Sequence, residues 1–227
     1  MKHVLITGGS DGLGKITAKK LSESGYVVTI LGHDEERTRL AASDIGCAYA
    51  VADVSDYDAV HEAITNSVNE NGPIDILINN AGRWIQDSLE SNDPKDIKRV
   101  FDVNALGPIF CTHVVVPEMK KLKSGRIINV ISGAGLQGKA ERAPYTASKF
   151  AVTGFTKSMQ LELKPFNIAV DGFYAGAMDT GLFEKSGNGR DMSKALDPEI
   201  AADTLVYVCG LPDGVSMPEF SLQSLRY

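Results

Sequence analysis

The stretch Thr7-Gly8-Gly9-Ser10-Asp11-Gly12-Leu13-Gly14 indicates the fold of this chain. It follows a short apolar run at residues 4–7 and opens directly onto an amphipathic segment at residues 14–24. Glycines permit a tight turn, and they let backbone amides approach a phosphate group at the start of a helix. The spacing, G-x-x-x-G-x-G, differs from the commoner dinucleotide-binding pattern, so a plain glycine-rich connection between a strand and a helix is the alternative.

Outward from this stretch, short β-rich runs alternate with longer amphipathic segments. The expected strands are residues 4–7, 27–31, 47–52, 74–78, 126–131 and 168–173, with a last one near 218–222. The clearest helical segments are residues 14–24, 57–70, 95–121, 143–164 and 198–210. This alternation predicts an α/β fold: a Rossmann-like, doubly wound parallel sheet of about seven strands, with helices on both faces in three α/β/α layers. Ligands of such folds bind at the carboxyl ends of the strands.

Prolines mark the fourth helical segment. Pro94 follows Asp93, a residue type that caps helices, and suits the first turn. Pro108 and Pro117 lie inside the segment, where a proline removes a backbone hydrogen bond. We therefore expect a kink or a break there.

Composition limits the class of protein. The 227 residues suit one domain covering 1–227, and the net charge of −6 argues against nucleic acid or an anionic membrane as a partner. No apolar run approaches the roughly 20 residues of a membrane span, and no signal-peptide pattern is present. Cys47, Cys111 and Cys209 have no metal-binding or redox spacing. We expect reduced thiols, no metal site and a cytoplasmic protein.

A second stretch, Tyr145-Thr-Ala-Ser-Lys149, carries acid–base chemistry. On a helix, this spacing places the phenol and the ammonium group on one face. A free tyrosine loses its proton near pH ~10. A positive charge about 5 Å away, at an effective dielectric near 20, is worth roughly 3 kcal/mol, or a little over two pKa units. We therefore expect Lys149 to lower the pKa of Tyr145 toward the range useful for general acid catalysis.

Polar residues also follow the third and fourth expected strands. Asp53 could accept a hydrogen bond from an adenine amino group, or it could cap a helix that begins near Asp56. The amides of Asn79-Asn80-Ala81-Gly82 can tie neighbouring strand ends together and lie against a cofactor, although an ordinary turn is the alternative.

Six features stand in one order along the chain: TGGSDGLG, Asp53, NNAG, Asn104, Ser132 and YTASK. Together they resemble the short-chain dehydrogenase/reductase superfamily in its compact single-domain branch, and the match covers essentially the whole chain. The resemblance implies an NAD(P)-dependent oxidoreductase that transfers a hydride between nicotinamide and a carbonyl compound or secondary alcohol. A catalytically silent dinucleotide-binding regulatory protein of the same fold is the alternative.

The resemblance also implies a role for each site residue. Tyr145 would protonate the carbonyl oxygen, and Lys149 would lower its pKa and hydrogen-bond the nicotinamide ribose. Ser132 would hold the substrate oxygen, and Asn104 would fix a water molecule that relays protons to Lys149. The expected cofactor-binding residues are Gly8, Ser10, Asp11, Gly12, Leu13, Gly14, His33, Asp53, Val54, Asn80, Ala81, Gly82, Tyr145, Lys149, Gly176, Met178 and Thr180.

Residues at the end of the second expected strand bear on the choice between NAD and NADP. Gly32 stands where the family often carries a carboxylate that selects NAD, and His33 stands where NADP users often carry arginine. Asp11 would repel a 2′-phosphate. Three nearby cations could offset it: Lys15, Arg37 and Arg39. We favour NADP(H) over NAD(H) by a small margin.

The resemblance places a carbonyl or alcohol substrate over Tyr145, beside a flexible loop at about residues 177–196. In that loop region the family usually has Pro-Gly, whereas this chain has Ala175-Gly176. The candidate apolar wall consists of Trp84, Leu136, Met178 and Phe183. Arg83 and Arg142 would favour an acidic substrate if they face it. We expect a homodimer formed through the long helices.

Overall fold

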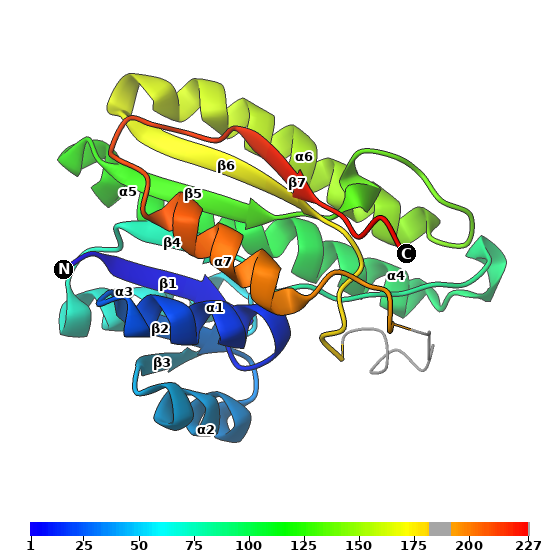
Figure 1. Ribbon diagram of the computed structural model, residues 1–227, viewed down its shortest axis with the longest axis horizontal. Coiled ribbons are helices and arrows are strands. Elements are labelled where there is room, and N and C mark those ends of the chain that lie inside the picture. The colour runs from blue at the N-terminus through cyan, green and yellow to red at the C-terminus, as the bar shows by residue number, and fades with distance from the viewer. Residues whose placement is uncertain (182–191, 227) are drawn as a thin grey trace.

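The computed structural model describes residues 1–181 and 192–226, and within them the strands form one parallel sheet (Figure 1). The strand order is β3-β2-β1-β4-β5-β6-β7. In chain order the strands are β1 (His3–Thr7), β2 (Val27–Gly32), β3 (Ala48–Val51), β4 (Ile76–Asn79), β5 (Gly125–Val130), β6 (Ile168–Ala175) and β7 (Glu219–Leu222). The doubly wound parallel fold is therefore confirmed, and each expected strand lies within a few residues of an observed one.

Helices cover both faces of the sheet. One face packs against α1 (Gly12–Glu23), α2 (Glu35–Ile45) and α7 (Pro198–Cys209). The other packs against α3 (Tyr57–Asn71), α5 (Gly107–Leu122) and α6 (Ala143–Leu163). A further helix, α4 (Pro94–Phe101), leads toward α5. The order of the strands changes direction between β1 and β4, which is where such sheets open a crevice for ligands.

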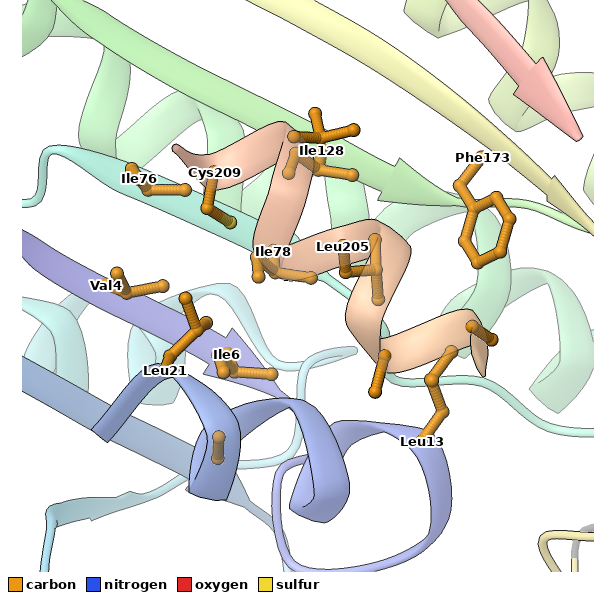
Figure 2. Close-up of a cluster of buried hydrophobic side chains, with 14 of the residues drawn as sticks. Val4, Ile6, Leu13, Leu21, Ile76, Ile78, Ile128, Phe173, Leu205 and Cys209 are labelled. Carbon is orange, nitrogen blue, oxygen red and sulfur yellow. The ribbon is translucent and has the colours of Figure 1, made fainter. Parts of the chain in front are cut away.

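The two cores follow from the alternation of side chains along each strand. Val4 and Ile6 of β1 lie in the core shared with α1 and α7, whereas Leu5 lies in the other core. Figure 2 shows the first core, in which side chains from β1, β4, β5 and β6 meet Leu21 of α1 and Leu205 of α7. Strands buried on both faces explain the nearly continuous apolar runs in the sequence.

Two parts of the helical layer differ from expectation. Helix α2 was not among the helices predicted; it begins after Asp34, whose side chain accepts from the Arg37 amide at 2.9 Å, and ends at the left-handed Gly46. The long fourth segment is divided by a π-helical turn, η2 (Asp102–Leu106). The helical run is therefore irregular just before Pro108, which has no amide to donate to the carbonyl group four residues earlier, while Pro117 lies inside α5.

The continuous run Pro94–Leu122 is long and apolar enough to cross a membrane by length and composition, with a mean hydropathy of 1.4 in its most apolar window. This differs from the expectation that no run approaches that length. Half of the window is buried inside the protein, and Cys111, Val115 and Met119 of α5 belong to the core. Core helices commonly pass the same test, so the run is weak evidence for a span.

The last strand is held by a buried ion pair. Arg126 of β5 and Asp171 of β6 are 5% and 0% exposed and form a salt bridge. Asp171 also accepts from the Ser216 hydroxyl at 2.7 Å and from the Met217 amide at 2.9 Å, which fixes the segment entering β7. This pair therefore places the residues after β7 beside the carboxyl ends of β5 and β6.

We predict that Asp171→Ala lowers the free energy of unfolding by about 3–5 kcal/mol, because it leaves the buried guanidinium of Arg126 without its partner. Asp213→Ala, which breaks the exposed Lys2–Asp213 pair, is the control and costs under about 1 kcal/mol. Urea unfolding followed by circular dichroism measures both. Similar losses in the two variants would contradict the anchoring role of Asp171.

Candidate active site

A continuous cleft of about 820 Å³ lies at the carboxyl ends of the strands. Every predicted cofactor-binding residue except Gly14 lines it, and so does Ser132. The sheet thus brings the glycine-rich stretch, the NNAG turn and the Tyr145–Lys149 pair to one cavity. Asn104 lies outside the lining, with 1% of its surface exposed.

The glycine-rich stretch forms the turn between β1 and α1, as its composition predicts. Asp11 caps α1, accepting from the Gly12 amide at 2.7 Å. A Cβ atom on Gly14 would stand 2.3 Å from the Gly8 carbonyl oxygen, so Gly14 serves close packing beneath the turn. The structure therefore does not place Gly14 among the residues that face a cofactor. The start of α1 opens into the cleft and can receive a phosphate group.

The two asparagines that end β4 fasten neighbouring strand ends, as predicted. The Asn79 amide donates to the Asn129 side chain at 2.8 Å on β5. The Asn80 amide donates to the carbonyl oxygens of Thr7 and Gly8 at 3.0 and 3.2 Å. The NNAG turn is thereby locked to the glycine-rich turn on the adjacent strand.

The phenol and the amine of the predicted pair are both buried in the first turns of α6. Tyr145 is 5% exposed and Lys149 is 6% exposed. The Lys149 Nζ donates to the Val130 carbonyl oxygen at 3.2 Å and lies 5.9 Å from the centre of the Tyr145 ring. The Ser132 side chain lies close enough to the phenol to favour its ionised form. Three of the four predicted catalytic side chains therefore meet at one point.

Burial controls the protonation of this pair. It raises the pKa of Tyr145 to about 12, and the Ser132 side chain and the Arg142 charge offset only part of the rise. Burial also lowers the pKa of Lys149 to about 8. The expected lowering of the Tyr145 pKa by Lys149 is therefore wrong for the protein without ligands. Desolvation penalises the phenolate and the ammonium group alike, and it is the largest cause of both shifts.

Asn104 lies in the π-helical turn, and its side chain is fully engaged by protein groups. It accepts from the Arg83 amide at 2.7 Å and donates to the Arg83 carbonyl oxygen at 2.9 Å. It also donates to the Ser148 hydroxyl at 3.1 Å. The side chain thus fastens the chain after NNAG to α6. The predicted water at Asn104 stays a prediction.

Asp53 lines the far end of the cleft, and its carboxylate is held by three donors. The amide and hydroxyl groups of Ser55 donate to Oδ1 at 3.0 and 2.7 Å, and Arg99 pairs with Oδ2. Burial alone would raise the pKa of Asp53, but these donors outweigh it and hold the pKa below its usual value. The helix that follows is capped by Asp56 instead.

The end of β2 has no room for a larger side chain. A Cβ atom on Gly32 would stand 2.3 Å from the Thr38 hydroxyl oxygen. Arg37 borders the cleft beside Ser10 and His33, and within the described residues its buried Nε has no hydrogen-bond partner. Sequence reasoning named Arg37 only as a nearby cation, because α2, which positions it, was not predicted.

Trp84 packs against the phenol of Tyr145. It is 5% exposed, and its ring centre lies 4.4 Å from that of Tyr145 in an edge-to-face arrangement. The Arg142 guanidinium lies 5.1 Å from the centre of the Trp84 ring. Trp84 and Met178 line the cleft as predicted, whereas Leu136 is 49% exposed and lies outside the lining.

Part of the predicted substrate loop, 177–196, lies outside the described residues, and so does Phe183. At the same end of the cleft, sequence reasoning missed Gln223 and Ser224. They directly follow β7, and the carboxyl end of a parallel strand is the signal that could have indicated them.

Comparison with known proteins shows the family of this chain. The sequence model of the short chain dehydrogenase family matches residues 2–191. The 3-dehydrosphinganine reductase of Danio rerio is 31% identical over 228 residues, covering 96% of this chain. The chain spans only 65% of the length of that relative.

Two further proteins match along most of their length. The 3-oxoacyl-[acyl-carrier-protein] reductase of Chlamydia muridarum is 33% identical over 235 residues, covering 98% of this chain and 90% of its own. The crystal structure of a 3-ketoacyl-(acyl-carrier-protein) reductase from Brucella melitensis, complexed with NADH, has a TM-score of 0.90 and 26% identity, covering 99% of this chain and 98% of its own. On its sequence match and its fold, the chain belongs to the short chain dehydrogenase family.

Proposed function

We propose that this protein is an NAD(P)-dependent oxidoreductase that transfers a hydride between nicotinamide and a carbonyl compound or secondary alcohol. One observation carries the proposal: a single cleft joins the start of α1, which suits a phosphate group, to Ser132, Tyr145 and Lys149. A dinucleotide with its phosphates at α1 can extend its nicotinamide toward the phenol. The Asn80 side chain joins the β1–α1 turn to the turn after β4, the strand that lies between β1 and β5.

The bound nicotinamide cofactor supplies the hydride, and the chain supplies proton handling and orientation. The high pKa of Tyr145 keeps its phenol protonated at neutral pH, which suits proton donation to a carbonyl oxygen. Ser132, which lies close to that phenol, can hold the same oxygen as negative charge develops. Carbonyl reduction requires the protonated phenol as acid, and alcohol oxidation requires the phenolate as base.

The names of the relatives support a ketone as substrate. One relative is named a 3-dehydrosphinganine reductase and another a 3-oxoacyl-[acyl-carrier-protein] reductase, so both names describe reduction at a 3-oxo carbon. In this chain the walls of the cleft include the apolar residues Trp84 and Ile85 and the polar residues Gln137 and Gln223. Such walls suit a ketone that carries a further polar group.

The end of β2 favours NADP(H). Thr38 occupies the space that a side chain at position 32 would need. This chain therefore has no carboxylate at that position to select NAD. Arg37 and His33 both line the cleft and offer donors to a 2′-phosphate, while Asp11 is engaged as the cap of α1.

We also propose a homodimer formed through the helices of the Asn104 and Tyr145 side. Leu106, Phe150 and Leu161 of η2 and α6 are 39%, 45% and 77% exposed and offer apolar side chains for such an interface. A single-chain mass by light scattering would contradict this.

The free cysteines Cys47, Cys111 and Cys209 support a reducing, cytoplasmic location.

Tyr145→Phe should remove turnover, by at least about 100-fold, while leaving dinucleotide affinity within about twofold, because only the proton donor is lost. Turnover is measured on a panel of ketones and aldehydes with NADPH and NADH separately, and affinity by calorimetry. Full activity of this variant would contradict the mechanism. If the parent binds dinucleotide and turns over no carbonyl compound, the catalytically silent alternative is correct.

Arg37→Ala should weaken NADP⁺ binding by about tenfold and leave NAD⁺ binding nearly unchanged, because only the 2′-phosphate loses a charged partner. Arg39→Ala, two residues along the same helix and outside the cleft lining, is the matched control. Calorimetric titrations with NADP⁺ and with NAD⁺ measure the affinity of each variant for both cofactors. Equal weakening for both cofactors would show that Arg37 does not read the 2′-phosphate.

A further inference from the structure

An arginine on α4 pairs with Asp53, which follows β3 at the edge of the sheet. Arg99 lines the cleft, and its side chain is 37% exposed. Its two terminal nitrogens are fixed, one to the Ser55 hydroxyl and the other to the Asp53 carboxylate. Val103, one helical turn further along, lines the same wall. A planar cation is therefore held in one orientation on a surface that faces the cavity.

The position of the adenine base follows from the two ends of the cleft. If the phosphates lie at the start of α1 and the nicotinamide lies beside Tyr145, the adenosine must occupy the β2 and β3 side. Asp53 and Val54 line the cleft on that side. A carboxylate has about four acceptor positions, and donors from Ser55 and Arg99 use three in Asp53. One position is left for the amino group of adenine.

We propose that Arg99 is an adenine-binding residue, whose guanidinium forms the wall against which the face of the base lies. This inference rests on the proposed function, since it assumes a dinucleotide in the cleft. A guanidinium is weakly hydrated and stacks well on π systems. The hydrogen bonds to Asp53 and Ser55 fix the orientation of the guanidinium plane before the ligand binds, so little side-chain freedom is lost on binding. A lysine ammonium at this place would keep the ion pair and lose the plane.

Arg99 would connect the adenine end of the cleft with the end that holds Tyr145. Helix α4 runs directly into η2, where the Asn104 side chain fastens Arg83 and Ser148. A base resting on Arg99 would therefore contact the same helical unit that holds the loop beside Tyr145.

The test compares Arg99→Lys and Arg99→Leu with the parent protein. We expect both variants to bind NADP⁺ and 2′,5′-ADP about tenfold more weakly by calorimetry, because neither offers a planar cation to adenine. Binding of reduced nicotinamide mononucleotide, which has no adenine, should stay unchanged. It is followed by quenching of Trp84, the single tryptophan of the chain. Lys98→Leu, on the same helix but outside the cleft lining, is the control.

A purely structural role for Arg99 gives a different pattern. Lysine would then preserve NADP⁺ affinity by keeping the pair with Asp53, and leucine would lower the melting temperature and weaken both kinds of ligand. That pattern, or unchanged NADP⁺ affinity in both variants, would overturn this inference while the proposed function stands. Failure of the parent to bind any dinucleotide would overturn the proposed function and this inference together.

Discussion

The site depends on the removal of one phenol and one amine from water. Tyr145 and Lys149 lie one helical turn apart on α6, and both are buried beside the end of β5. Desolvation disfavours the charged form of each, so it raises the pKa of the first and lowers that of the second. Trp84 packs against the phenol and helps to keep water away. The protein without ligands therefore holds a protonated acid in a largely apolar environment.

The remainder of the cleft is organised around that pair by contacts between strand ends. Asn79 and Asn80 join β4 to β5 and β1, and Asn104 joins the following loop to α6. These buried amides each satisfy several backbone or side-chain groups, which makes their geometry specific. As a result, the start of α1 and the Tyr145 phenol line the same cavity.

The fold could be predicted from local pattern because strands buried on both faces give clear apolar runs. Features that depend on long-range contacts could not. Pro108 marks the π-helical turn just before it, but helix α2 is mostly polar and was missed. The pKa of Tyr145 is raised and not lowered as expected, because the burial of its phenol depends on tertiary packing. The pairing of Arg99 with Asp53 joins residues 46 positions apart, and nothing local indicates it.

The protonation of Lys149 tests the role of burial most directly. Lysine labelled with ¹³C at the ε carbon can be titrated by NMR in the protein without ligands, with the Lys149 signal assigned by its loss in Lys149→Met. A midpoint near pH 8 is the expected result, because burial lowers the pKa of this amine. A midpoint at or above pH ~10.4, the value of a free lysine, would contradict the account.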